Sequence, residues 1–157
     1  MLKDYNKLVN SKEFKNWKDK HKDAYLSSCV LINDSGAKGN WSFDFYIPRK
    51  NRITTFIVDK YIIMSEDQKI FEQTKKKLKE VNINEIKFDL DNVHKFIDKK
   101  YKIKPMKIII VLQYLNKLTW NISLLGTDFN LVNMKLDAKT GKLLDKTTTS
   151  MLQFKAS

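Results

Sequence analysis

The chain has 157 residues, of which 42% are hydrophobic and 31% charged, with a formal net charge of +12 at pH 7. This composition is typical of one large or two small globular domains, and the low glycine and proline content argues against long disordered linkers. No apolar run reaches the roughly 18 residues of a membrane-spanning helix, so we expect no membrane span.

The first third of the chain predicts helices followed by strands. Apolar side chains at helical spacing predict a helix over residues 3–9, and Ser11 is placed to cap a second amphipathic helix over 11–23. From Tyr25 the period changes to that of strands, which we expect at 25–32, 41–47, 53–58 and 61–64.

The remainder of the chain predicts a similar order of elements. Residues 65–80 begin with a capping box and end in lysines, which predicts a connecting helix. A further helical stripe covers 90–101, and strands are expected at 106–115, 118–125, 129–136 and 142–149. In the last hairpin, Asp137 starts the turn and Gly141 supplies the positive φ that closes it.

The two halves look like copies of one unit. Trp41 opens a strand pair that ends at Asp59, and Trp120 opens another that ends at Asp137 at nearly the same spacing. Each pair follows an apolar run that follows a helical stretch. We therefore expect a duplication, with one unit over residues 1–64, a connecting helix over 65–84 and a second unit over 85–157.

The segment from Trp120 to Leu144 resembles the PepSY domain, in which a helix precedes a strand pair and a "V-x-V-D-A-x-T-G-x-V"-like hairpin. The positions that match this hairpin are Leu136, Asp137, Ala138, Thr140, Gly141 and Leu144. The first unit looks like a divergent relative, and the whole chain resembles small archaeal-type proteins with tandem PepSY-like units. Hairpins of this kind also occur in unrelated β proteins, so an unrelated α+β fold stays open.

The resemblance implies an α+β fold of two cystatin-like units, each a helix packed on a four-stranded antiparallel sheet. It also implies a non-enzymatic module that binds proteins or peptides, such as a peptidase inhibitor or regulator. Binding would use an open sheet face or edge, or an aromatic groove. The expected contacts are Tyr46, Arg49, Arg52, Tyr61 and Tyr114. The sequence leaves the oligomeric state and the identity of the partner open.

The charge suggests an alternative function. Lysines beside aromatic residues on a sheet could bind single-stranded nucleic acid, and lysine-rich faces are attracted to other anionic surfaces. However, only Arg49 and Arg52 are arginines, and arginine is the residue preferred for bidentate phosphate recognition. The lysine excess is also consistent with a solvated surface.

Catalytic chemistry is not indicated. Cys29 is the single cysteine and lies in an apolar run, and His21 and His94 provide no metal-ligand spacing, so we expect no catalytic residue, no metal and no cofactor. Asp59 and Asp137 stand at strand ends, where capping of turns is their ordinary role. The N-terminus lacks a signal peptide, which predicts a cytoplasmic protein as written, or an extracytoplasmic one if a leader has been removed.

Overall fold

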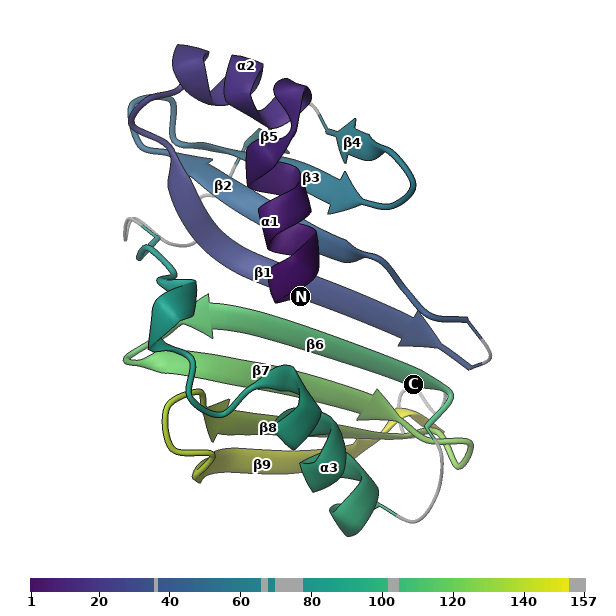
Figure 1. The fold of residues 1–157 in the computed structure, drawn as a ribbon. Helices are drawn as coiled ribbons and strands as arrows, with labels where there is room; N and C mark the ends of the chain where they lie inside the picture. The colour runs from purple at the N-terminus through teal and green to yellow at the C-terminus, as the bar shows by residue number, and fades with distance from the viewer. Residues whose placement is uncertain (36, 66–67, 70–77, 102–104, 153–157) are drawn as a thin grey trace.

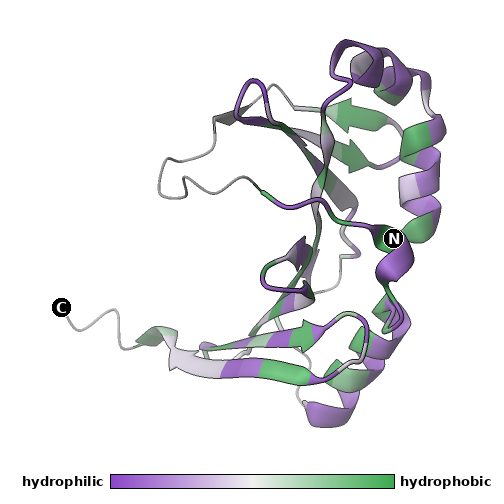
Figure 2. Ribbon diagram, turned by 90° about the vertical axis from the view of Figure 1, so that its left-hand side faces the viewer, coloured by the Kyte–Doolittle hydropathy of each residue, from purple (hydrophilic) through white to green (hydrophobic). Residues whose placement is uncertain are grey.

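The computed structural model describes residues 1–35, 37–65, 68–69, 78–101 and 105–152 of the chain. Their dominant feature is one antiparallel sheet with the strand order β4-β3-β2-β1-β6-β7-β8-β9, in which the short β5 also pairs with β3. The sheet is curved, and its helices all lie on the convex side (Figures 1 and 2). The concave side carries no helix among the described residues.

The N-terminal half contributes two helices and the first strands. Helix α1 (Leu2–Asn10) runs into α2 (Lys12–Lys20), which begins where the Ser11 Oγ accepts a hydrogen bond from the Phe14 N–H at 3.1 Å. The strands are β1 (Tyr25–Asp34), β2 (Trp41–Ile47), β3 (Arg52–Val58), β4 (Ile62–Met64) and β5 (Gln68–Lys69). These helices and β1 to β4 confirm the elements expected from sequence periodicity.

The C-terminal half begins with a 3-10 turn, η1 (Ile83–Glu85), followed by α3 (Leu90–Lys100). Four strands follow: β6 (Lys107–Tyr114), β7 (Leu118–Leu125), β8 (Asn130–Asp137) and β9 (Leu143–Ser150). Most of the helix predicted over 65–80 falls outside the described residues, and Gln68–Lys69 within it form a strand instead. The division into units at 1–64 and 85–157 stays a prediction.

The expectation of two separate cystatin-like units, each a helix on its own four-stranded sheet, is wrong. Strands β1 and β6 pair directly from Ser28↔Gln113 to Asp34↔Lys107, so the halves share a single sheet. Two separate four-stranded sheets would each leave a long apolar edge strand open, and pairing those edges removes both. The joint between β1 and β6 is called the seam below.

The core lies between the helices and the convex face of the sheet. Phe14 and Trp17 of α2 pack on Phe45 and Phe56, with ring centroids 4.9 to 5.6 Å apart. In the other half, Trp120 is fully buried and its indole N–H donates to the Phe88 carbonyl at 2.8 Å. The aromatic contacts hold α2 on the convex face, and the Trp120 hydrogen bond holds the segment that leads into α3.

Candidate functional site

The described helices leave the concave face of the sheet uncovered (Figure 2). Strand register assigns its side chains, because directly opposed residues in an antiparallel pair point to the same face. Trp41, Phe43 and Phe45 of β2 point to the core, so the residues between them point to the concave side. The register extends this assignment across every neighbouring strand.

Apolar side chains gather at the middle of the concave face. Val30 opposes Val111 and Ile32 opposes Ile109 across the seam, and we call these four residues the apolar centre. Three of them are half-buried, and Ile32 keeps 45% of its surface exposed. Ile63, 52% exposed, extends the apolar surface toward the β4 edge. Partly exposed apolar side chains that cluster at the middle of a face are typical of a protein-binding surface.

The two strand lysines of this face are each paired with an aspartate of the same face. Lys107 lies 3.3 Å from Asp34, and Lys135 lies 3.1 Å from Asp145. Among the described strand residues, the concave face therefore has no excess of positive charge.

Several hydroxyl and carboxylate groups of the same face also form hydrogen bonds within it. The Asp44 carboxylate accepts hydrogen bonds from the hydroxyls of Ser28 and Thr55, both at 2.6 Å. The Ser123 hydroxyl donates to the Asn133 side-chain carbonyl at 2.6 Å. Polar groups that already have hydrogen-bond partners lose less free energy when water is removed from them. A partner protein can therefore cover these groups at a lower cost in free energy.

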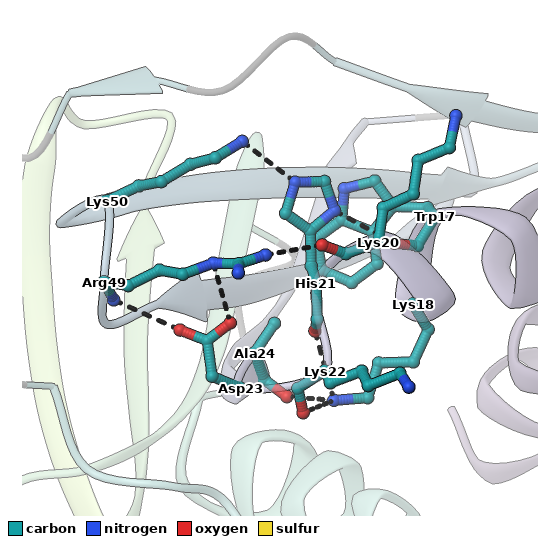
Figure 3. Close-up of polar contacts among 9 residues, drawn as sticks. All are labelled: Trp17, Lys18, Lys20, His21, Lys22, Asp23, Ala24, Arg49 and Lys50. Carbon is teal, nitrogen blue, oxygen red and sulfur yellow. Dashed lines mark hydrogen bonds and ion pairs between the residues drawn. The ribbon is translucent and has the colours of Figure 1, made fainter.

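A second feature lies where α2 ends against the β2–β3 turn. We call it the basic cluster, and it is drawn in Figure 3; it comprises Lys18, Lys20, His21, Lys22, Arg49 and Lys50. Lys18 donates to the carbonyls of Lys22 and Ala24, and the Arg49 guanidinium donates to the Lys20 carbonyl. Cations at a helix C-terminus satisfy its last carbonyls, so these two side chains have a structural role.

His21 has one tautomer in this cluster. Its Nδ1 lies 2.9 Å from the Trp17 carbonyl oxygen, which can only accept, so Nδ1 carries the hydrogen. Nε2 is then the acceptor for the Lys50 ammonium at 2.9 Å. The ring also stacks on Trp17 with centroids 4.9 Å apart. His21 is therefore held by these three contacts as a structural side chain.

Arg49 is tied down by an acid. Its Nε lies 3.2 Å from the Asp23 carboxylate, which also accepts from the Arg49 backbone N–H. Desolvation of Asp23 opposes ionisation, but these hydrogen bonds and the nearby guanidinium together lower its pKa on balance. Lys20 and Lys22 extend away from these contacts in Figure 3.

The five side chains predicted as contacts are not gathered in one site. Tyr46 is on the concave face but is buried, with its hydroxyl donating to Asn51 at 2.9 Å. Arg49 is in the adjoining turn, and Arg52 is on the convex side, where it lines a groove with His21 and Trp17. Tyr61, 72% exposed, follows β3 at its opposite end.

Tyr114 lies in the other half of the chain, at the end of β6. It is half-buried, and the Lys79 ammonium lies 4.9 Å from its ring centroid. Sequence reasoning missed the apolar centre, although one signal pointed to it. Residues 108–112 are apolar without alternation, and such a strand presents apolar side chains to both faces of its sheet.

The groups considered for catalysis have structural surroundings. Cys29 is fully buried in the core, and burial raises the pKa of its thiol far above the ordinary value. Asp137 accepts from the backbone N–H groups of Lys139 and Thr140, as a turn-capping residue does. Burial of Asp137 opposes ionisation, but these bonds and Lys117 lower its pKa on balance.

Within the described part of the chain, no cluster of potential metal ligands is present, and no helix is both long and apolar enough to cross a bilayer.

Comparisons with known proteins add information on the fold. No protein-family model matches the chain, and no curated protein matches its sequence. Among solved structures, the chain is similar to a protein from Clostridium difficile 630 described as "a putative lipoprotein". The TM-score is 0.60 at 16% sequence identity, and the match covers 87% of this chain and 90% of the other. At this identity the likeness shows a shared fold alone, and the PepSY resemblance stays a prediction.

Proposed function

We propose that the protein is a non-enzymatic binding module that holds a protein or peptide partner on the concave face of its sheet. The observation that carries the proposal is the apolar centre, which lies on the seam of a continuous face whose two strand lysines each pair with an aspartate. Protein interfaces have this arrangement, with an apolar middle and a polar surround.

The same observation favours a protein over a nucleic acid. Binding of nucleic acid draws most of its affinity from unpaired cations that meet phosphates. On the concave face, Lys107 and Lys135 are each engaged by an aspartate, and no basic stripe runs across the strands. The basic cluster lies at the end of α2, where Lys18 and Arg49 hold main-chain carbonyls.

The working compartment is part of the proposal. The structural neighbour is described as "a putative lipoprotein". We therefore place the binding role on the extracytoplasmic side, which sequence analysis kept open.

The test uses one variant on the face and a matched control away from it. Ile32→Asp puts a charge into the apolar centre, whereas Leu2→Asp changes a similarly exposed residue (53%) of α1. The wild type and both variants are used as baits against an extract of the source organism. Captured proteins are then purified and titrated against each of the three baits. We expect a partner that binds the wild type and Leu2→Asp but binds Ile32→Asp about tenfold or more weakly.

Two results would contradict the proposal. One is a captured partner that binds Ile32→Asp as well as the wild type. The other is salt-dependent binding of a single-stranded oligonucleotide that competes for the same face.

A further inference from the structure

The two edges of the sheet differ in how open they are. At one edge, β4 has three residues, and β5 occupies a further part of β3. At the other edge, β9 runs for eight residues, and all but its first and last are exposed. No described strand pairs with the outer side of β9. A long open edge offers a row of backbone donors and acceptors to an incoming strand.

The hydrogen-bond phase identifies which residues of β9 face outward. Met151 N–H donates to the Phe129 carbonyl at 2.9 Å, and these residues continue the register in which Ser150 opposes Asn130. Hydrogen-bonded and non-hydrogen-bonded pairs alternate along an antiparallel ladder. Thr147 and Thr149 therefore bond to β8. The residues between and beside them, Lys146, Thr148 and Ser150, present their N–H and C=O groups to the edge.

The neighbouring ladder gives the same phase independently. Gly126 N–H donates to the Asn130 carbonyl at 2.9 Å, so Asn130 and every second residue of β8 bond to β7. The intervening residues of β8 are left to bond to β9, and they are the partners of Thr147 and Thr149.

The charges that could guard this edge are engaged elsewhere. Asp145 pairs with Lys135 on the concave face, and the Lys146 ammonium lies 5.5 Å from the Tyr101 ring centroid on the convex face. Beyond them, β9 continues with three β-branched threonines and has no proline or glycine. Natural edges are usually blunted by charges, prolines or bulges. The register shift of the β8–β9 pair, between Lys135 and Leu136, lies before the stretch from Lys146 to Ser150, in which threonine favours strand pairing.

A cavity of about 290 Å³ lies beside the same stretch of the edge on the convex side. Its lining includes Tyr101, Pro105, Leu124, Val132, Lys146 and Thr148. A residue paired with Thr148 in an added antiparallel strand would point to this side of the sheet. Its side chain would lie at the rim of the cavity, where apolar groups of Leu124 and Val132 are available.

We propose that β9 binds an extended segment of a partner protein as an added antiparallel strand, with an apolar side chain opposite Thr148 entering the cavity. Main-chain hydrogen bonds would supply affinity and the cavity would supply selectivity. A second copy of this chain fits less well. Pairing β9 with itself about Thr148 would place only lysine, threonine and serine opposite its outward residues Lys146, Thr148 and Ser150. This site is separate from the concave face and does not depend on it.

The test selects ligands from a phage-displayed library of random nine-residue peptides and compares two substitutions at one position. Thr148→Pro removes the outward N–H without removing a bond to β8, and proline is tolerated at such edge positions. Thr148→Val keeps the N–H and the shape. We expect selected peptides to bind the wild type and Thr148→Val alike, and Thr148→Pro about tenfold more weakly or worse.

Hydrogen exchange on the wild-type complex provides a second readout that does not depend on the folding of any variant. We expect the amides of Lys146, Thr148 and Ser150 to gain protection when the peptide binds. The proposal is overturned if no peptide is enriched, if Thr148→Pro binds equally well, or if protection appears elsewhere. A wild-type dimer that Thr148→Pro converts to a monomer would assign the edge to a second copy and also overturn it.

Discussion

Gly141 closes the β8–β9 turn, and its replacement by alanine separates two physical effects. Its φ is +73°, a left-handed conformation that residues with a Cβ adopt at a cost of about 1–2 kcal/mol. A Cβ at this position would also lie no more than 3.0 Å from three ring carbons of Phe88. Ordinary carbon contacts are nearer 3.5–4.0 Å, so the ring would have to move.

The backbone of Phe88 is held in place, so its ring can yield only by rotating about its side-chain bonds. Its backbone N–H donates to the Ala138 carbonyl at 2.9 Å, and its carbonyl accepts from the Trp120 indole at 2.8 Å. Overpacking against a ring on an anchored backbone costs about 1–3 kcal/mol. We therefore expect Gly141→Ala to lower the free energy of unfolding by about 2–5 kcal/mol, the sum of both effects.

A double-mutant cycle with Phe88→Ala isolates the second effect. In that background the ring is gone, so Gly141→Ala should cost only the backbone contribution of about 1–2 kcal/mol. The free energy of unfolding of all four proteins is measured by urea denaturation, followed by tryptophan fluorescence. Equal costs in the two backgrounds would refute the contact argument. A cost below about 1 kcal/mol in the wild type would refute the conformational one as well.

Two other predictions concern the second half of the sheet. Trp120→Ala should destabilise the protein by about 3–5 kcal/mol in chemical denaturation, because it empties a fully buried site and leaves the Phe88 carbonyl unpaired. Trp120→Phe fills most of that site and should cost clearly less. Equal costs of the two substitutions would contradict this prediction. Asp137 has a lowered pKa when folded, so its ionised form stabilises the protein above the unfolded value of about 4, and this stabilisation is lost as the pH falls through the folded pKa. Asp137→Asn should therefore destabilise the protein at pH 7 and progressively less toward pH 2 in urea denaturation, and a pH-independent cost would count against the capping role.

Local structure was largely predictable from the sequence because its signals are local. Ser11 was expected to cap the second helix and does so, and Gly141 was expected to have a positive φ and has one. Strand positions followed from alternation, as in β2, where Trp41, Phe43 and Phe45 point inward. Each of these features depends on residues within a few positions along the chain.

The arrangement of strands was not predictable in the same way. Pairing of β1 with β6 joins residues far apart in the sequence, such as Val30 and Val111, and no local pattern encodes it. The expectation of two separate sheets failed for this reason. The lack of information on strand arrangement also affected the prediction of the site. The sequence shows that Tyr46 and Arg52 are near one another along the chain. It does not show that they lie on opposite faces of the sheet.

The position of the seam gives the proposed binding face a physical condition. Val30 and Ile32 come from one half of the chain, and Val111 and Ile109 from the other, so the apolar centre exists only when the halves are paired. Each half alone would expose these residues at an open strand edge, where they favour aggregation rather than selective binding. Pairing converts two vulnerable edges into the middle of one face. The joining of the halves is thus the step that creates the surface on which the proposed function depends.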